Sequence, residues 1–103
     1  MGSASPKPTQ CLLLKNMFNP AEESGADWVA EITEDTREEC SRHGQVVHIH
    51  VDPESRGYVY VKFADEAAAA AARAVLHGRW YSHKQIIAAF QFTQLYNRHF
   101  GLA

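Results

Sequence analysis

Acidic side chains are concentrated in one segment of this chain. Between Glu22 and Glu39 lie eight Asp or Glu residues and a single base, Arg37, so this segment has a net charge of −7. Because the whole chain of 103 residues carries −2, the remainder carries +5. A strongly acidic segment in a small chain favours a basic partner, and it disfavours general nucleic-acid binding, which needs a basic surface.

Four of these acids have a spacing that brings them together on a helix. They are separated by four, three and one positions: Glu31, Asp35, Glu38 and Glu39. The first three share one helix face, and the fourth lies beside it. Like charges at such spacings repel each other by about 0.2–0.5 kcal/mol per pair, and a cationic ligand would relieve this repulsion.

The chain offers no arrangement typical of an active site or a metal centre. It has no nucleophile with an evident base, no glycine-rich phosphate loop and no paired acids. His48 and His50 share one strand face, which can bind a metal weakly, but no Cys or carboxylate completes a tetrahedral site. Cys40 falls on an inward helix stripe and should be inert. We therefore expect neither enzymatic activity nor a metal or other cofactor.

Hydrophobic periodicity predicts a two-layer α+β fold. Strands are expected over 11–15, 45–52, 58–63 and 85–92, and helices over 27–43, 66–76 and 94–100. The order β-α-β-β-α-β is typical of a ferredoxin-like sandwich, in which a four-stranded antiparallel sheet has two helices on one face. A short C-terminal helix follows the last strand. The longest apolar run, 67–72, is too short to cross a membrane, so no membrane partner is expected.

Two patterns indicate which residues face inward. In the first predicted helix, an inward stripe recurs at every fourth position: Trp28, Ile32, Thr36 and Cys40. In the second strand, alternation predicts that Val47, Ile49 and Val51 share one face. Asp27 and Asp65 are the predicted N-caps of the two helices. The segment from Arg79 to His83 is predicted to be a loop.

The sheet face without helices leaves two interpretations open. Tyr58 and Tyr60 would stand on this face, where two aromatic rings can stack on RNA bases at about 1–3 kcal/mol per base. Alternatively, the C-terminal segment covers them with its own apolar side chains, Leu95, Tyr96 and Phe100. The acidic balance of the chain disfavours RNA binding as the main role.

Several segments together resemble a known family. Residues 56–63, Arg-Gly-Tyr-Val-Tyr-Val-Lys-Phe, resemble the longer signature of the RNA recognition motif, and residues 12–17 resemble the shorter one. That family usually has a base-stacking aromatic residue where Leu13 stands. The loop Arg79-Trp80-Tyr81 and the acidic helix resemble the U2AF homology motif (UHM), a branch that binds peptides instead of RNA. Over residues 9–92, the similarity is closest to the C-terminal domain of CAPER-type splicing factors.

This resemblance implies a domain, a site and partners. It implies a UHM domain over 9–103, preceded by a tag or linker at 1–8. Arg79 should pair with Glu39, and a ligand tryptophan should lie between this pair and the ring of Tyr81, with Trp80 as the middle residue of the motif. The acids Glu31, Asp35 and Glu38 should meet Lys or Arg residues that flank that tryptophan. The implied partners are nuclear splicing factors, namely the large subunit of the U2 auxiliary factor and the largest subunit of splicing factor 3b. Self-association is left open.

Overall fold

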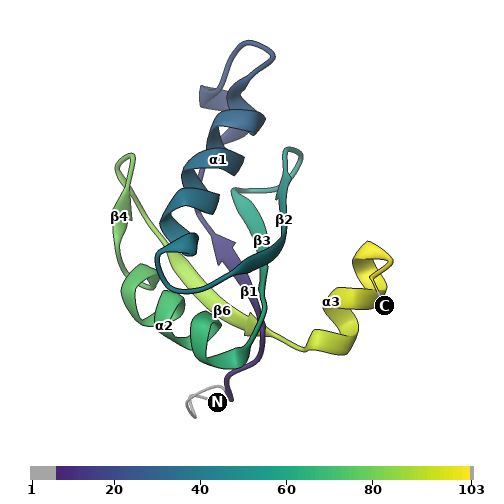
Figure 1. Ribbon diagram of the computed structural model, residues 1–103. Coiled ribbons are helices and arrows are strands. Elements are labelled where there is room, and N and C mark those ends of the chain that lie inside the picture. The colour runs from purple at the N-terminus through teal and green to yellow at the C-terminus, as the bar shows by residue number, and fades with distance from the viewer. Residues whose placement is uncertain (1–6, 103) are drawn as a thin grey trace, which may run out of the picture.

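The computed structural model describes residues 7–102, so most of the predicted tag or linker lies outside the described residues. The elements in chain order are β1 (Cys11–Lys15), a 3-10 turn η1 (Pro20–Glu22), α1 (Trp28–Ser41), β2 (Val46–Asp52), β3 (Tyr58–Phe63), α2 (Glu66–Leu76), β4 (Trp80–Tyr81), β5 (Lys84–Gln85), β6 (Ile87–Gln91) and α3 (Thr93–Phe100). Figure 1 shows this arrangement from the side of the first two helices.

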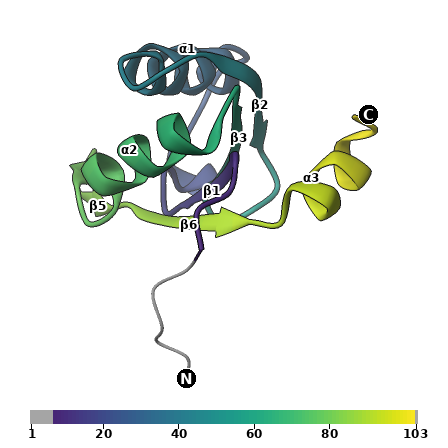
Figure 2. The same cartoon turned by 60° about the horizontal axis from the view of Figure 1, so that its bottom comes forward.

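The predicted fold class is confirmed. Four antiparallel strands form one sheet in the order β2-β3-β1-β6, and β4 and β5 form a separate two-stranded hairpin. Helices α1 and α2 lie on one face of the sheet, whereas α3 lies beyond the other face (Figure 2). This is the ferredoxin-like sandwich with an added C-terminal helix.

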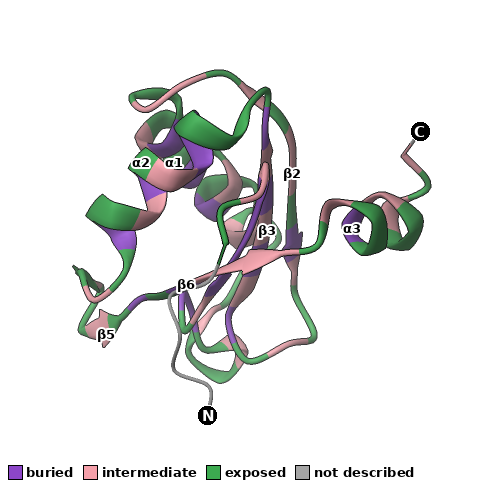
Figure 3. Cartoon of the chain, turned by 90° about the horizontal axis from the view of Figure 1, so that it is seen from below, coloured by how far each residue is buried: buried purple, intermediate pink, exposed green. Residues whose placement is uncertain are grey.

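The core fills the space between the sheet and the first two helices. β1 contributes Leu12 and Leu14, which are fully buried, and β3 contributes alternate residues through Phe63. The buried residues lie on the strands and on the helix sides that face the sheet (Figure 3). The alanine side chains of α2 allow a close approach: a Cβ placed at Gly44 would overlap the Cβ of Ala68.

Three local predictions need correction. A β-bulge lies between Val46 and His48, so Val46 packs against the core while Val47 is 49% exposed. A one-residue shift of this kind turns a side chain to the other face of the sheet. Asp27 occupies the N-cap position of α1, but its side chain makes no capping hydrogen bond. The predicted loop after Gly78 contains the β4–β5 hairpin.

α3 covers part of the second sheet face. Tyr96 is buried, its hydroxyl lies 2.7 Å from Nδ1 of His48, and its ring approaches those of Tyr60 and Phe100 at 6.2 and 4.9 Å. Lys62 of β3 donates to the side chain of Asn97 at 2.8 Å. α3 is therefore held on the sheet by aromatic packing and by polar contacts.

Candidate functional site

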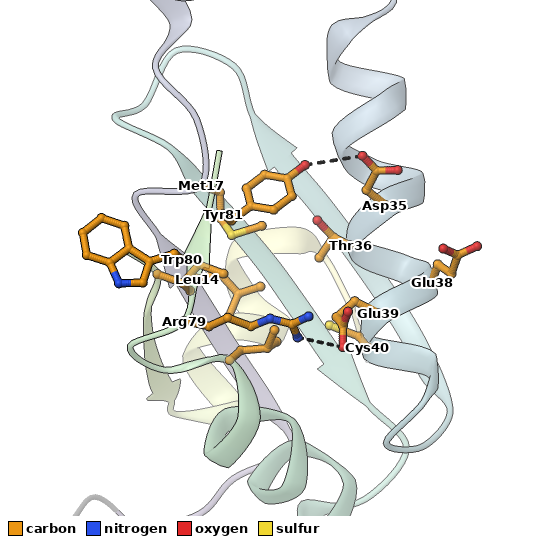
Figure 4. A pocket seen from close by; sticks show the side chains of 12 residues that line it. Leu14, Met17, Asp35, Thr36, Glu38, Glu39, Cys40, Arg79, Trp80 and Tyr81 are labelled. Atoms are coloured by element: carbon orange, nitrogen blue, oxygen red, sulfur yellow. Dashed lines mark hydrogen bonds and ion pairs between the residues drawn. The ribbon is translucent and has the colours of Figure 1, made fainter. Parts of the chain in front are cut away.

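A pocket of about 280 Å³ opens between α1, the end of α2 and the β4–β5 hairpin (Figure 4). This volume is at the lower end of the roughly 300–1,000 Å³ typical of ligand pockets, which suits one large side chain. Its lining residues are Leu14, Met17, Asp35, Thr36, Glu38, Glu39, Cys40, Leu76, Arg79, Trp80, Tyr81 and Ile86.

The base of the pocket is apolar and fixed by the core. Leu14, Met17, Leu76 and Ile86 are all buried and belong to the core cluster. Met17 is held in place because its N–H donates to the carbonyl of Gly57 at 2.9 Å. The base is therefore a preformed apolar surface.

An ion pair closes one side of the pocket. Arg79 Nη1 lies 3.0 Å from Glu39 Oε2, which is the pair expected from the sequence. Glu39 also has Arg42 Nη1 at 3.8 Å and His43 Nε2 at 3.9 Å, so basic side chains surround it. Arg79 is positioned by its backbone, which donates to Leu76 at 3.0 Å and accepts from Ile86 at 2.8 Å.

The β4–β5 hairpin carries the opposite wall. Ser82 and His83 connect its strands with φ values of 50° and 68°, and positive φ at both positions is typical of a type I′ turn. Tyr81 is half-buried, and its hydroxyl donates to Asp35 Oδ2 at 3.4 Å. Burial, together with the negative charge of Asp35, raises the pKa of Tyr81, so its hydroxyl stays protonated and able to donate.

The remaining acids and Trp80 lie at the margin. Asp35 and Glu38 are exposed on the rim of the pocket. Glu31 is exposed one turn earlier on α1 and does not line the pocket. Trp80 touches the pocket but is 67% exposed, and Figure 4 shows its ring directed away from α1.

The sheet-face residues of the alternative interpretation are partly covered. Leu13 is buried, with 8% exposure, and therefore presents little surface to a ligand. Tyr60 packs against α3, with its ring centroid 5.1 Å from that of Phe100 and 5.8 Å from that of His99. Burial raises the pKa of Tyr60. Tyr58 is half-buried at the start of β3.

Two residues that line the pocket were predicted only as core. Thr36 and Cys40 belong to the inward stripe of α1, yet both face the pocket. Burial raises the pKa of Cys40 to about 12, which keeps it a protonated thiol. The periodicity placed both residues inward, but it carried no signal for an opening in front of them.

Neither a metal cluster nor a membrane span occurs in the described part of the chain. Residues 7–102 bring together no group of three or more His, Cys, Asp or Glu side chains that could hold a metal ion. Within the same residues, no helix has the length and hydropathy needed to cross a membrane.

Comparison with known proteins identifies related sequences. A family profile described as "RNA recognition motif" matches residues 31–87, and one described as "linker between RRM2 and RRM3 domains in RBM39 protein" matches residues 1–28. The second match extends through β1, which is an integral strand of the sheet.

Three curated relatives differ widely in their named roles. The chain is 39% identical over 96 residues to inner nuclear membrane protein Man1 of Mus musculus, covering 92% of this chain and 10% of Man1. It is 33% identical over 93 residues to serine/threonine-protein kinase Kist of Mus musculus, covering 88% and 22%. It is 30% identical over 91 residues to a U2af large-subunit splicing factor of Oryza sativa subsp. japonica, covering 81% and 16%. The chain thus spans less than a quarter of the length of each relative.

Solved structures agree on the fold. The structure titled "Structure of RNA15 RRM" superposes with a TM-score of 0.62 and 19% identity, covering 85% of this chain and 95% of that chain. At this identity, the similarity establishes the architecture alone.

Proposed function

Because the chain belongs to the RNA recognition motif family, we propose that it is a UHM-type member, which binds a tryptophan-containing basic peptide. The observation that carries the proposal is the pocket itself: an apolar base lies between the Arg79–Glu39 pair and the ring of Tyr81, with carboxylates on the rim. We propose that the domain covers residues 9–103. The hydroxyl of Thr9 donates to the carbonyl of Gln91 at 2.6 Å, which ties this end of the chain to β6.

The pocket suits an indole ring in three respects. Its base supplies apolar surface, the guanidinium of Arg79 is a flat cation on which an aromatic ring can stack, and Tyr81 offers a second ring. Burying roughly 200 Å² of indole at about 25 cal/mol per Å² supplies around 5 kcal/mol before ordering costs. The tryptophan is therefore the anchor of the complex.

The acidic rim suits the residues that flank the tryptophan. Asp35 and Glu38 are exposed beside the pocket, and Glu31 continues the same acidic helix. Exposed ion pairs contribute only about 0.2–1 kcal/mol each, so these acids set the association rate and the choice of partner more than the affinity. We expect a complex in the micromolar range, roughly 7–9 kcal/mol.

The relatives and the rim together favour partners in pre-mRNA splicing. One relative is named a splicing factor, and one profile match is to a segment of RBM39. We propose that the chain acts in the nucleus. Its partners would be the large subunit of the U2 auxiliary factor and the largest subunit of splicing factor 3b, through basic segments that contain tryptophan.

Calorimetric titration with such a peptide tests the proposal. Arg79→Ala and Tyr81→Ala should each weaken binding by at least about tenfold, because each removes one wall of the indole site. A peptide in which alanine replaces the tryptophan is the ligand control and should not bind measurably. Trp80→Ala is the matched protein control, since its ring points away from the pocket, and it should change the affinity less than about threefold. Unchanged affinity in both wall variants would place the ligand elsewhere.

A second candidate function is RNA binding on the sheet face. The observation that favours it is the half-buried ring of Tyr58, which precedes Tyr60 by two positions on β3 and so shares its face of the sheet. A chemical-shift titration with short oligonucleotides separates the two functions. Saturable shifts at Tyr58 and Tyr60 would favour RNA, and shifts confined to Arg79 and Tyr81 on peptide addition would favour the pocket.

A further inference from the structure

Thr36 brings an unsatisfied hydroxyl group to the pocket. The residue is 4% exposed, and its Oγ1 has no hydrogen-bond partner among residues 7–102. A threonine within a helix often bonds its hydroxyl to a carbonyl three or four residues earlier, as Thr33 does to Val29 at 2.7 Å. Thr36 does not make this bond. Its oxygen is therefore desolvated without compensation, which is rare and unfavourable in native structures.

The position of this hydroxyl connects it to the pocket. Thr36 lies on the side of α1 that faces Tyr81 (Figure 4). The neighbouring base of the pocket is apolar and offers no side-chain donor, since it consists of Leu14, Met17 and Ile86 on that side. An acceptor that lacks a donor within the described part of the protein, and that lines a binding pocket, points to a donor on the ligand.

We propose that Thr36 is a specificity-determining residue that accepts a hydrogen bond from the indole N–H of the bound tryptophan. This inference rests on the proposed function. Indole has one N–H donor and no acceptor on an otherwise apolar ring, and a single buried acceptor above an apolar base complements that pattern. Phenylalanine would fit the same pocket but leave the oxygen of Thr36 unsatisfied, and this difference would select tryptophan.

The ligand reaches this oxygen by displacing the ring of Tyr81. The hydroxyl of Thr36 is covered, and Tyr81 is held nearby by its hydrogen bond to Asp35. At 3.4 Å and exposed to solvent, that bond is long and weak, so the ring can move at little cost.

The rim carboxylates are the competing acceptors. Glu39 is engaged by Arg79 at 3.0 Å, and Asp35 is exposed to water. An acceptor in contact with water discriminates poorly between ligands, because water replaces the hydrogen bond that a ligand fails to make. A buried acceptor has no such replacement.

The test compares two peptides that differ only at the ring nitrogen. One contains tryptophan, and the other contains 3-benzothienylalanine, in which sulfur replaces the N–H with nearly the same shape. Wild-type protein should prefer the tryptophan peptide by about three- to tenfold, the worth of one neutral hydrogen bond. Thr36→Val should reduce this preference below about twofold, and Thr36→Ser should retain it.

A stability measurement gives an independent readout. Because Thr36→Val removes a buried hydroxyl that lacks a partner in the described chain, it should raise the Tm of the free protein by several degrees while it lowers the preference for indole. Thr33→Val is the matched control: the same substitution on the same helix, outside the pocket, should leave the ligand preference unchanged.

The outcomes separate this inference from the proposed function. If the tryptophan peptide does not bind wild-type protein, both fail. If it binds but Thr36→Val keeps the wild-type preference, only the role of Thr36 is overturned, and loss of the preference in Asp35→Asn would assign the acceptor to the rim. Equal binding of the two peptides by wild-type protein would likewise overturn the hydrogen bond and leave the pocket standing.

Discussion

Replacing Tyr96 by alanine should release α3 from the sheet. Tyr96 is 3% exposed, and its hydroxyl lies 2.7 Å from Nδ1 of His48. An aromatic side chain of this kind buries roughly 150–250 Å², which at about 25 cal/mol per Å² corresponds to about 4–6 kcal/mol. Truncations of large aromatic side chains cost about 3–5 kcal/mol. We therefore expect the packing energy removed by Tyr96→Ala to exceed what the eight residues of α3 can otherwise supply.

The reduction in global stability should be smaller than this value, because α3 can detach while the rest stays folded. The main core cluster contains no residue of α3. An isolated helix of this length is not stable in water, so α3 should unfold once it leaves the sheet. Tyr96→Phe is the control, since it keeps the ring and should cost only about 1 kcal/mol.

Hydrogen exchange read residue by residue measures the effect. In Tyr96→Ala, the amides of α3 should exchange at nearly unprotected rates, whereas the amides of β1 and β3 should remain protected. The uncovered ring of Tyr60 should also make oligonucleotide binding stronger than in wild type, by about 1–3 kcal/mol per stacked base. Continued protection of α3 in Tyr96→Ala, or simultaneous loss of protection throughout the sheet, would refute the view that α3 is a separable cover.

Four further predictions concern single residues. Burial, together with the positive charges of His50 and Lys62, lowers the pKa of His48 below its ordinary value of 6.5, so the folded state resists protonation and α3 should loosen as the pH falls below about 6.5, as measured by amide exchange. Cys40, with a pKa of about 12, should resist iodoacetamide until the protein unfolds, as mass spectrometry will show. Gly57→Ala should lower the free energy of unfolding by more than about 1 kcal/mol, as chemical denaturation will show, since φ is +94° and the new Cβ would lie 2.5 Å from the carbonyl oxygen of Phe18. Asp65→Ala should cost about 0.5–2 kcal/mol in urea denaturation, because the side chain caps α2.

The elements with a strong local signal could be predicted from the sequence. β3 has the predicted bounds, 58–63, because apolar residues alternate along its whole length. α2 also has the predicted bounds, since Asp65 caps it through a hydrogen bond from the N–H of Ala68 at 2.8 Å and its alanines favour a helix. These features depend on neighbouring residues alone, so they can be recognised in the sequence.

The features that escaped prediction depend on contacts or on atypical turn residues. The β4–β5 hairpin turns through Ser82 and His83, whereas Asn-Gly or Asp-Gly is the usual signal for such a turn. The bulge at Val46 has no sequence signature that alternation could reveal. Thr36 was correctly placed on the inward stripe, but whether an inward side chain meets the sheet or an opening is decided by where the hairpin lies.

β1 shows why the two candidate binding faces can be examined separately. Its successive residues point to opposite faces of the sheet: Leu14 lies in the base of the pocket, while Leu13 lies on the face that α3 partly covers. One layer of strands therefore separates the indole site from the aromatic cluster around Tyr60 and Tyr96. Since Tyr81 and Tyr96 lie on opposite sides of this layer, substitutions at these two positions act on different surfaces, and their free-energy effects should combine nearly additively. Loss of peptide binding in one variant and gain of RNA binding in the other would then be independent evidence, not two readings of a single disturbed fold.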